Sequence, residues 1–188
     1  KAAQLIGYVP QNHAPVYDYS VRDFIVMGRA PHLGMLEKPS GKDYAIVDEV
    51  IRELGIEKLA DKAYTQISGG ERQQALIGRA IAQQPEIIMF DEPTNHLDIS
   101  YQMQIFDFIK RLNVTVLSAI HDLNLAALYC DRLYVLKNGK IVLQGTPEEV
   151  LTEEHIYEVY GVKSSVSIHP VTGKLAITYL PEALQNIA

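Results

Sequence analysis

The 188-residue chain is long enough for one sizeable domain, and its hydrophobic fraction of 47% and charged fraction of 21% are ordinary for a globular protein. A net charge of −6 argues against an electrostatic grip on nucleic acid, and the single cysteine, Cys130, excludes an intrachain disulfide. No apolar run reaches the roughly 20 residues that a membrane-spanning helix needs, so we expect any membrane role to run through a partner.

The first expected element is a strand at residues 5–9, which Pro10 and Gln11 close. The chain starts without a Met and enters this strand within five residues, so we expect further domain to precede Lys1. The next stretch is mainly helical in pattern, with a short helix at 21–27, a loop at 31–42 and a helix at 44–54.

The middle of the chain alternates helices and strands. A helix is expected at residues 70–83, followed by an apolar run at 87–90 that is typical of a strand buried on both faces of a parallel sheet. Helical spacing returns at 105–112, a second buried strand follows at 114–120, and another helix starts near 123. This order predicts a parallel α/β sheet.

The last part of the chain carries two hairpin signals. Apolar segments at 133–136 and 141–143 flank the turn pair Asn138-Gly139. A capping box at 146–149 opens the next helix, and a terminal hairpin is expected within 165–179.

The segment Ser68-Gly69-Gly70-Glu71 stands at the head of the helix predicted at 70–83. Ser68 and Glu71 have capping-box spacing, and the two glycines let a bulky ligand approach the backbone. The exposed amides and the helix dipole favour an anion there. Taken alone, the tetrapeptide is more often simply a well-capped helix.

Two carboxylates, Asp91 and Glu92, follow the strand predicted at 87–90. Crowded carboxylates raise the free energy unless a cation or hydrogen bonds compensate. Asp91 suits magnesium, which proteins hold with one or two carboxylates plus nucleotide phosphates. Glu92 is then placed to polarise a water for attack on a γ-phosphate, although a solvated acidic turn is the plainer alternative.

His121 follows the second buried strand, and Asp122 comes directly after it. A lone histidine is more often structural than catalytic. Ligands of open α/β sheets bind beyond the carboxyl ends of the strands, and the matched position of His121 therefore favours a functional role.

These segments, in this order, resemble the ATPase subunits of ATP-binding-cassette (ABC) transporters over nearly the whole chain. The similar segments are Tyr8-Val-Pro-Gln11 (Q-loop), Ile67-Ser-Gly-Gly-Glu-Arg-Gln73 (signature, with Ile where Leu is usual), Ile87 to Pro93 (Walker B and catalytic glutamate), Asn95-His-Leu-Asp98 (D-loop) and His121 (switch histidine).

The resemblance implies an α/β fold with a P-loop NTPase-like parallel sheet core and an inserted helical subdomain, lacking its N-terminal portion. It divides the chain into a core strand and Q-loop at 1–11, a helical subdomain with the signature at 12–84, a RecA-like core at 85–161 and a C-terminal hairpin and tail at 162–188.

The resemblance also implies roles at a site for ATP and Mg²⁺. Gln11 would sense the metal and the attacking water, Asp91 would hold the metal, Glu92 would be the general base and His121 would contact the γ-phosphate. The opposite face, Ser68, Gly69, Gly70 and Glu71, would bind ATP held by a second copy in a head-to-tail dimer, and Asp98 would communicate across that interface.

A phosphate-binding loop of the form Gly-x-x-x-x-Gly-Lys-Ser/Thr does not occur in these 188 residues. The pairs Gly41-Lys42, Gly139-Lys140 and Gly173-Lys174 are not followed by Ser or Thr, and Ser40-Gly-Lys42 is interpreted as part of a loop. Losing three phosphate bonds at roughly 1.5 kcal/mol each costs on the order of a thousandfold in affinity. We therefore expect this chain alone neither to bind ATP tightly nor to hydrolyse it.

Ser20 to Gly34 and the terminal hairpin are similar to importers of iron-siderophores, haem and vitamin B12. This similarity implies a subunit that docks on transmembrane permease subunits at the inner, cytoplasmic face of the cell membrane. The subunit would energise uptake of a metal chelate that a solute-binding protein delivers, with no role for nucleic acid.

Two alternatives stay open. One is a soluble ABC ATPase acting on nucleic acid or ribosomes, although Gln11 and Ser68 are 57 residues apart without heptads and only one signature is present. The other is a non-catalytic module that binds partners through the helical region at 12–66.

Overall fold

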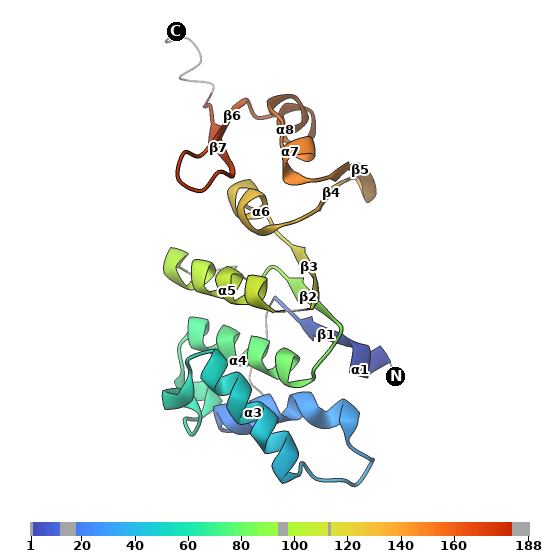
Figure 1. Ribbon diagram of the computed structural model, residues 1–188, viewed down its shortest axis with the longest axis vertical. Helices are drawn as coiled ribbons and strands as arrows, with labels where there is room; N and C mark the ends of the chain where they lie inside the picture. Colours follow the sequence, from blue (N-terminus) through green and yellow to red (C-terminus); the bar gives the residue numbers. More distant parts are fainter. Residues whose placement is uncertain (1, 12–17, 94–97, 113, 182–188) are drawn as a thin grey trace. The chain divides into compact units, whose positions relative to one another are not determined.

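The computed structural model describes residues 2–11, 18–93, 98–112 and 114–181 (Figure 1). The chain divides into two compact units, Lys1–Ala119 and Ile120–Ala188. In the described residues, no helix is both long enough and apolar enough to cross a membrane.

The first unit is built on a three-stranded parallel sheet, which confirms the predicted α/β class. After the short helix α1 (Ala2–Leu5), its strands are β1 (Ile6–Val9), β2 (Ile87–Asp91) and β3 (Thr115–Ala119), with β2 in the centre. Val9 lies opposite Phe90, and Asp91 lies opposite Ala119. Because the strands are parallel, all their carboxyl ends meet at one edge of the sheet.

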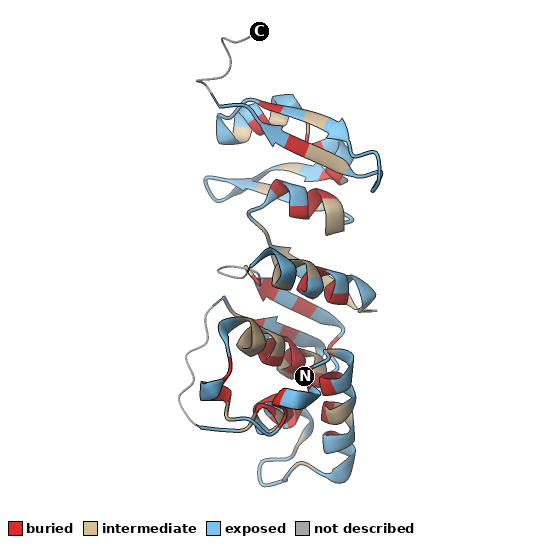
Figure 2. Cartoon of the chain, turned by 90° about the vertical axis from the view of Figure 1, so that its left-hand side faces the viewer, coloured by how far each residue is buried: buried red, intermediate tan, exposed pale blue. Residues whose placement is uncertain are grey.

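The expectation that β2 is buried on both faces is wrong for the described structure. Val9, Ile88 and Phe90 are at most 3% exposed, on the face that packs against helix α4 (Gly69–Ala82). No described helix of this unit covers the other face, whose apolar side chains are between 38% and 54% exposed (Figure 2); these are Ile6, Tyr8, Ile87, Met89 and Leu117.

The remaining helices of the first unit are α2 (Val21–Val26), α3 (Gly41–Glu53), α5 (Ile99–Arg111) and the 3₁₀ segments η1 (Met27–His32), η2 (Glu57–Leu59) and η3 (Tyr64–Gln66). The loop predicted at 31–42 is therefore too long, and Ser40 is the N-cap of α3 rather than a loop residue. The Asp43 carboxylate accepts hydrogen bonds from Ser40 N (2.9 Å) and Ser40 Oγ (2.7 Å), which fixes this start.

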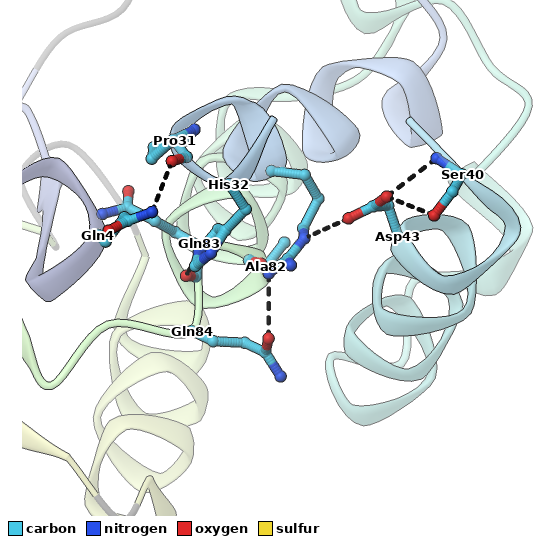
Figure 3. A network of polar contacts seen from close by, with 9 residues as sticks. Gln4, Pro31, His32, Ser40, Asp43, Ala82, Gln83 and Gln84 are labelled. Carbon is cyan, nitrogen blue, oxygen red and sulfur yellow. Dashed lines mark hydrogen bonds and ion pairs between the residues drawn. The ribbon is translucent and has the colours of Figure 1, made fainter. Parts of the chain in front are cut away.

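A buried ion pair joins η1 to α3 and to the end of α4 (Figure 3). Arg29 and Asp43 are 6% and 7% exposed, and Arg29 Nε lies 2.9 Å from Asp43 Oδ1. Arg29 Nη1 also donates to Ala82 O (2.7 Å) and to Gln84 Oε1 (3.1 Å). The guanidinium thus satisfies groups from α3 and from the C-terminal end of α4 at once.

The residue after α4 ties this helix to the start of the sheet. The Gln83 side-chain amide donates to Ala3 O and Ile6 O, each at 2.7 Å, and His32 Nε2 lies 2.7 Å from Gln83 O. Gly28 lets η1 pack closely against α4, because a Cβ at this position would lie 2.0 Å from Arg79 O.

The second unit contains two antiparallel hairpins, both of which the sequence predicted. Its elements are α6 (Leu123–Tyr129), β4 (Leu133–Lys137), β5 (Lys140–Gly145), α7 (Pro147–Val150), α8 (Glu153–Tyr160), β6 (Ser164–Ile168) and β7 (Leu175–Tyr179). Its core is a cluster of buried apolar side chains from α6, α7, α8, β7 and the residue after α7, namely Leu123, Ala127, Val150, Leu151, Ile156 and Ile177.

Candidate functional site

The carboxyl ends of β1 and β2 bring two of the predicted site residues into direct contact. Gln11 follows β1, Glu92 follows β2, and these strands are parallel neighbours. Gln11 Nε2 donates a hydrogen bond to Glu92 Oε2 at 2.7 Å. The sheet therefore joins side chains that are 81 residues apart in sequence.

The backbone turns sharply at Glu92. Its φ is 49°, which is the left-handed region that non-glycine residues seldom adopt. That conformation costs about 1 kcal/mol, and such strain persists where the surrounding structure imposes it, often at functional sites. Glu92 is half-buried, and Pro93 behind it is fully buried, so the turn stands on a packed base.

Asp91 is held by a residue that the sequence analysis did not single out. Tyr8 Oη donates to Asp91 Oδ2 at 3.2 Å, and partial burial, followed by this bond and the nearby carboxylate charge, raises the pKa of Tyr8. Tyr8 lies opposite Met89, two residues before Asp91. The sequence did carry a signal for Tyr8, because this residue belongs to the same Tyr-Val-Pro-Gln segment as Gln11.

Ser68 and Glu71 form the predicted capping box at the start of α4. Glu71 N donates to Ser68 Oγ (3.3 Å), and Ser68 N donates to Glu71 Oε2 (2.7 Å). The hydrogen bond from the Ser68 backbone, and next that from its side chain, lowers the pKa of Glu71. An ionised Glu71 is therefore built into this helix start.

The two glycines of this segment have different surroundings. A Cβ added at Gly69 would meet nothing within 4 Å, whereas one at Gly70 would lie 3.2 Å from three ring carbons of Tyr101. Gly69 alone therefore leaves open space for an incoming group. The missing side chain of Gly70 makes room for an aromatic ring of α5.

Asp98 is the N-cap of α5, and its Oδ1 accepts a hydrogen bond from Tyr101 N at 2.9 Å. Asn95, His96 and Leu97 of the predicted D-loop lie outside the described residues. Because Tyr101 also covers Gly70, the first turn of α5 contacts the start of α4. Tyr101 thus links Asp98, to which it is hydrogen-bonded, with Gly70 of the Ser68–Glu71 segment.

His121 lies in the second unit, in the two-residue link between β3 and Asp122, which is the N-cap of α6. Asp122 Oδ1 accepts hydrogen bonds from Asn124 N (2.8 Å) and Leu125 N (3.1 Å). The approach of His121 to Asp91 and Glu92 remains a prediction, because the latter two belong to the first unit.

The donor set at the edge of the sheet suits magnesium better than a tightly caged metal. The described residues contain no group of three or more His, Cys, Asp or Glu side chains that could hold a metal by themselves. Magnesium needs only one or two carboxylates when phosphates and waters complete its shell. The exposed Asp91 carboxylate at the end of β2 fits that requirement.

Comparison with known proteins shows that this chain is similar to ATP-binding proteins of ABC transporters. Residues 1–95 match the family model described as ABC transporter. A hemin import ATP-binding protein of Plesiomonas shigelloides is 37% identical over 199 residues, which cover 94% of this chain and 74% of that protein.

Two further similarities extend over nearly the whole chain. An ABC transporter ATP-binding protein of Bacillus subtilis (strain 168) is 37% identical over 185 residues, covering 96% of this chain but only 42% of that relative's length. A solved metal-chelate type ABC transporter in an inward-facing conformation superimposes with a TM-score of 0.87 at 28% identity, covering 96% of this chain and 75% of the other.

Proposed function

The chain belongs to the ABC transporter family, and from that premise we propose that it is part of the ATP-binding, ATP-hydrolysing subunit of an importer. The observation that carries the proposal is the contact between Gln11 and Glu92 beside Asp91. It places an amide and two carboxylates at the edge of a parallel sheet, where such folds bind ligands.

In this proposal Glu92 is the general base. Its carboxylate accepts a hydrogen bond from Gln11 through Oε2, which leaves further lone pairs on the carboxylate to orient a water molecule. The left-handed backbone at Glu92 fixes where that carboxylate leaves the strand. Gln11 would sense the same water and would link its position to the loop after β1.

Asp91 would hold Mg²⁺, and Tyr8 would keep one oxygen of that carboxylate in place. When bound, the metal neutralises charge on the phosphates of ATP. We expect His121 to contact the γ-phosphate, since it follows the neighbouring strand β3.

Ser68, Gly69, Gly70 and Glu71 would serve the nucleotide of a second copy of the subunit. The start of α4 offers free backbone amides and a helix dipole to an anion, and Gly69 is open to approach. Asp98 would communicate between the two copies, because its helix contacts Gly70 through Tyr101.

The proposed cargo is a metal chelate such as an iron-siderophore, haem or cobalamin. Support comes from the names of the relatives, one of which imports hemin, and from the metal-chelate type of the structural neighbour. The subunit would act on transmembrane permease subunits at the inner face of the membrane, with a solute-binding protein delivering the cargo.

The decisive experiment needs a chain that includes a phosphate-binding loop, so its first step is to read the coding sequence upstream of Lys1 in frame. In the longest in-frame product, Glu92→Gln should lower the ATP turnover rate at least about a hundredfold, because it removes the general base. Glu86→Gln, at the opposite end of β2, is the matched control and should keep turnover.

Equal turnover in the Glu92→Gln and wild-type proteins would refute the assigned role. We expect the 188-residue chain by itself to show no turnover, and activity of that chain abolished by Glu92→Gln would contradict this expectation. Capture of permease by the 188-residue chain without ATP would favour the alternative of a partner-binding module.

A further inference from the structure

The C-terminal hairpin of the second unit is docked on the helix that starts directly after His121. Helix α6 contacts strand β7, and Leu123 and Ile177 belong to one buried apolar cluster, at 8% and 6% exposure. The first turn of α6 therefore lies against the middle of β7. Apolar burial is non-directional, so by itself it leaves some freedom in the register between two elements.

Asn124 removes that freedom with a two-point contact. Ile177 N donates to Asn124 Oδ1 at 2.8 Å, and Asn124 Nδ2 donates to Ile177 O at 3.2 Å. The side-chain amide thus bonds both backbone groups of one residue, as a neighbouring strand would. Because both bonds must form together, they fix the register between α6 and β7.

The same turn holds the residue next to His121. Asp122 Oδ1 accepts hydrogen bonds from the backbone N of Asn124 (2.8 Å) and of Leu125 (3.1 Å). Burial, then the Asp122 carboxylate and then Tyr160 raise the pKa of Tyr179, the last residue of β7. Asp122 is thus also close to the end of β7.

We propose that Asn124 is a positioning residue for His121, through which the β6–β7 hairpin sets the orientation of the imidazole. This inference rests on the proposed contact of His121 with nucleotide. The path runs from the backbone of Ile177 to Asn124, from Asn124 N to the Asp122 side chain, and along the chain to His121. Displacing the hairpin would release the loop that carries His121.

The test compares Asn124→Ala with the wild-type 188-residue chain by NMR, without nucleotide. Loss of the amide should speed hydrogen exchange at Ile177 N–H about fivefold, the factor that corresponds to one lost hydrogen bond of about 1 kcal/mol. The ring ¹H and ¹⁵N signals of His121, assigned with His121→Gln, should move or broaden. His155, whose Nδ1 lies 3.1 Å from Val150 O, should keep its signals.

Gln144→Ala is the matched control, because it removes an exposed amide from β5 of the same unit and should change neither readout. Should Asn124→Ala fail to fold, Asn124→Asp keeps the acceptor for Ile177 N and loses the donor to Ile177 O. Asn124→Asp should therefore produce smaller changes in the same direction.

Faster exchange at Ile177 with unchanged His121 signals would overturn the proposal, because the amide would then serve packing alone. Unchanged exchange at Ile177 would overturn it as well. Neither readout requires ATP, so this inference can fail while the proposed ATPase function stands, and the turnover assay with Glu92→Gln decides the latter separately.

Discussion

At its C-terminal end, helix α4 is tied to η1 and to the start of the sheet, whereas its N-terminal end begins with a capping box next to an open glycine. Arg29 and His32 bond the carbonyls of Ala82 and Gln83, and the Gln83 amide bonds the start of the sheet. At the other end, Ser68 and Glu71 close the capping box, Arg72 donates to Tyr64 O and Thr65 O, and Gly69 is open.

The C-terminal end of α4 thus anchors the helix, and the N-terminal end is the part that it presents to other groups. The last carbonyls of a helix have no partner within the helix, and here Arg29 supplies a partner for that of Ala82 inside the protein. A helix fixed at one end can offer its other end to a ligand without moving as a whole. The comparison can be tested by weakening each end in turn.

The largest effect should come from Arg29→Met, which breaks the anchored end. It leaves the Asp43 carboxylate and the Ala82 carbonyl buried without the guanidinium, and we expect the free energy of unfolding to fall by about 3 kcal/mol. Urea unfolding followed by circular dichroism measures this change. Arg52→Met, on the exposed side of α3, should cost under about 0.5 kcal/mol.

A loss for Arg29→Met as small as that for Arg52→Met would mean that the buried pair does not anchor the helix. The contrast between the two ends of α4 would then have no energetic basis.

The next effect concerns pH and the same anchored end. Hydrogen bonds from the backbone and hydroxyl of Ser40, and then Arg29, hold the pKa of Asp43 well below its usual 3.8. A lowered folded-state pKa stabilises the protein above the unfolded pKa, and this contribution is lost as the pH falls through the folded-state pKa. The stability gap between the wild type and Asp43→Asn should therefore narrow below about pH 4.

Urea midpoints at pH 7 and pH 3 for both proteins check this prediction. Asp61→Asn is the control, since the Asp61 side chain is 95% exposed, and its gap to the wild type should stay constant. A gap that widens toward acid would reverse the assigned sign.

The smallest effect should distinguish the two glycines at the open end of α4. Gly69→Ala meets nothing within 4 Å and should raise the free energy of unfolding by about 0.5 kcal/mol, because alanine restricts the unfolded chain. Gly70→Ala should lose that gain, since its Cβ would crowd the Tyr101 ring at 3.2 Å.

In a Tyr101→Ala background, Gly70→Ala should recover the gain seen for Gly69→Ala. Identical effects of the two glycine substitutions in the wild-type background would show that the Tyr101 ring moves aside freely. Thermal unfolding of the five proteins measures both points.

Local patterns carried most of what the sequence predicted. The capping boxes at Ser68–Glu71 and Thr146–Glu149 and the turn at Asn138-Gly139 are present as expected. Each depends on residues within four positions of one another, so their spacing alone defines the geometry. The parallel sheet followed from the alternation of helices and strands.

Contacts between distant segments were the part that spacing could not supply. Arg29 and Asp43 are 14 residues apart and Tyr8 and Asp91 are 83 apart, and no periodic pattern links either pair. The start of α3 was misplaced because apolar spacing begins only at Tyr44, although Ser40 and Asp43 already had capping-box spacing. The one-sided burial of β2 depends on which helices pack on the sheet, and an apolar run does not encode that.

The amide of Asn124 bonds backbone atoms of Ile177, so these two hydrogen bonds do not depend on which side chain stands at position 177. Another apolar side chain of similar shape could therefore replace that of Ile177 while both hydrogen bonds to Asn124 persisted. A deletion or insertion of one residue in β7 would be tolerated far less, because it would present the opposite face of the strand to α6. The hairpin is thus constrained in length as well as in the apolar side chains that it packs against the core.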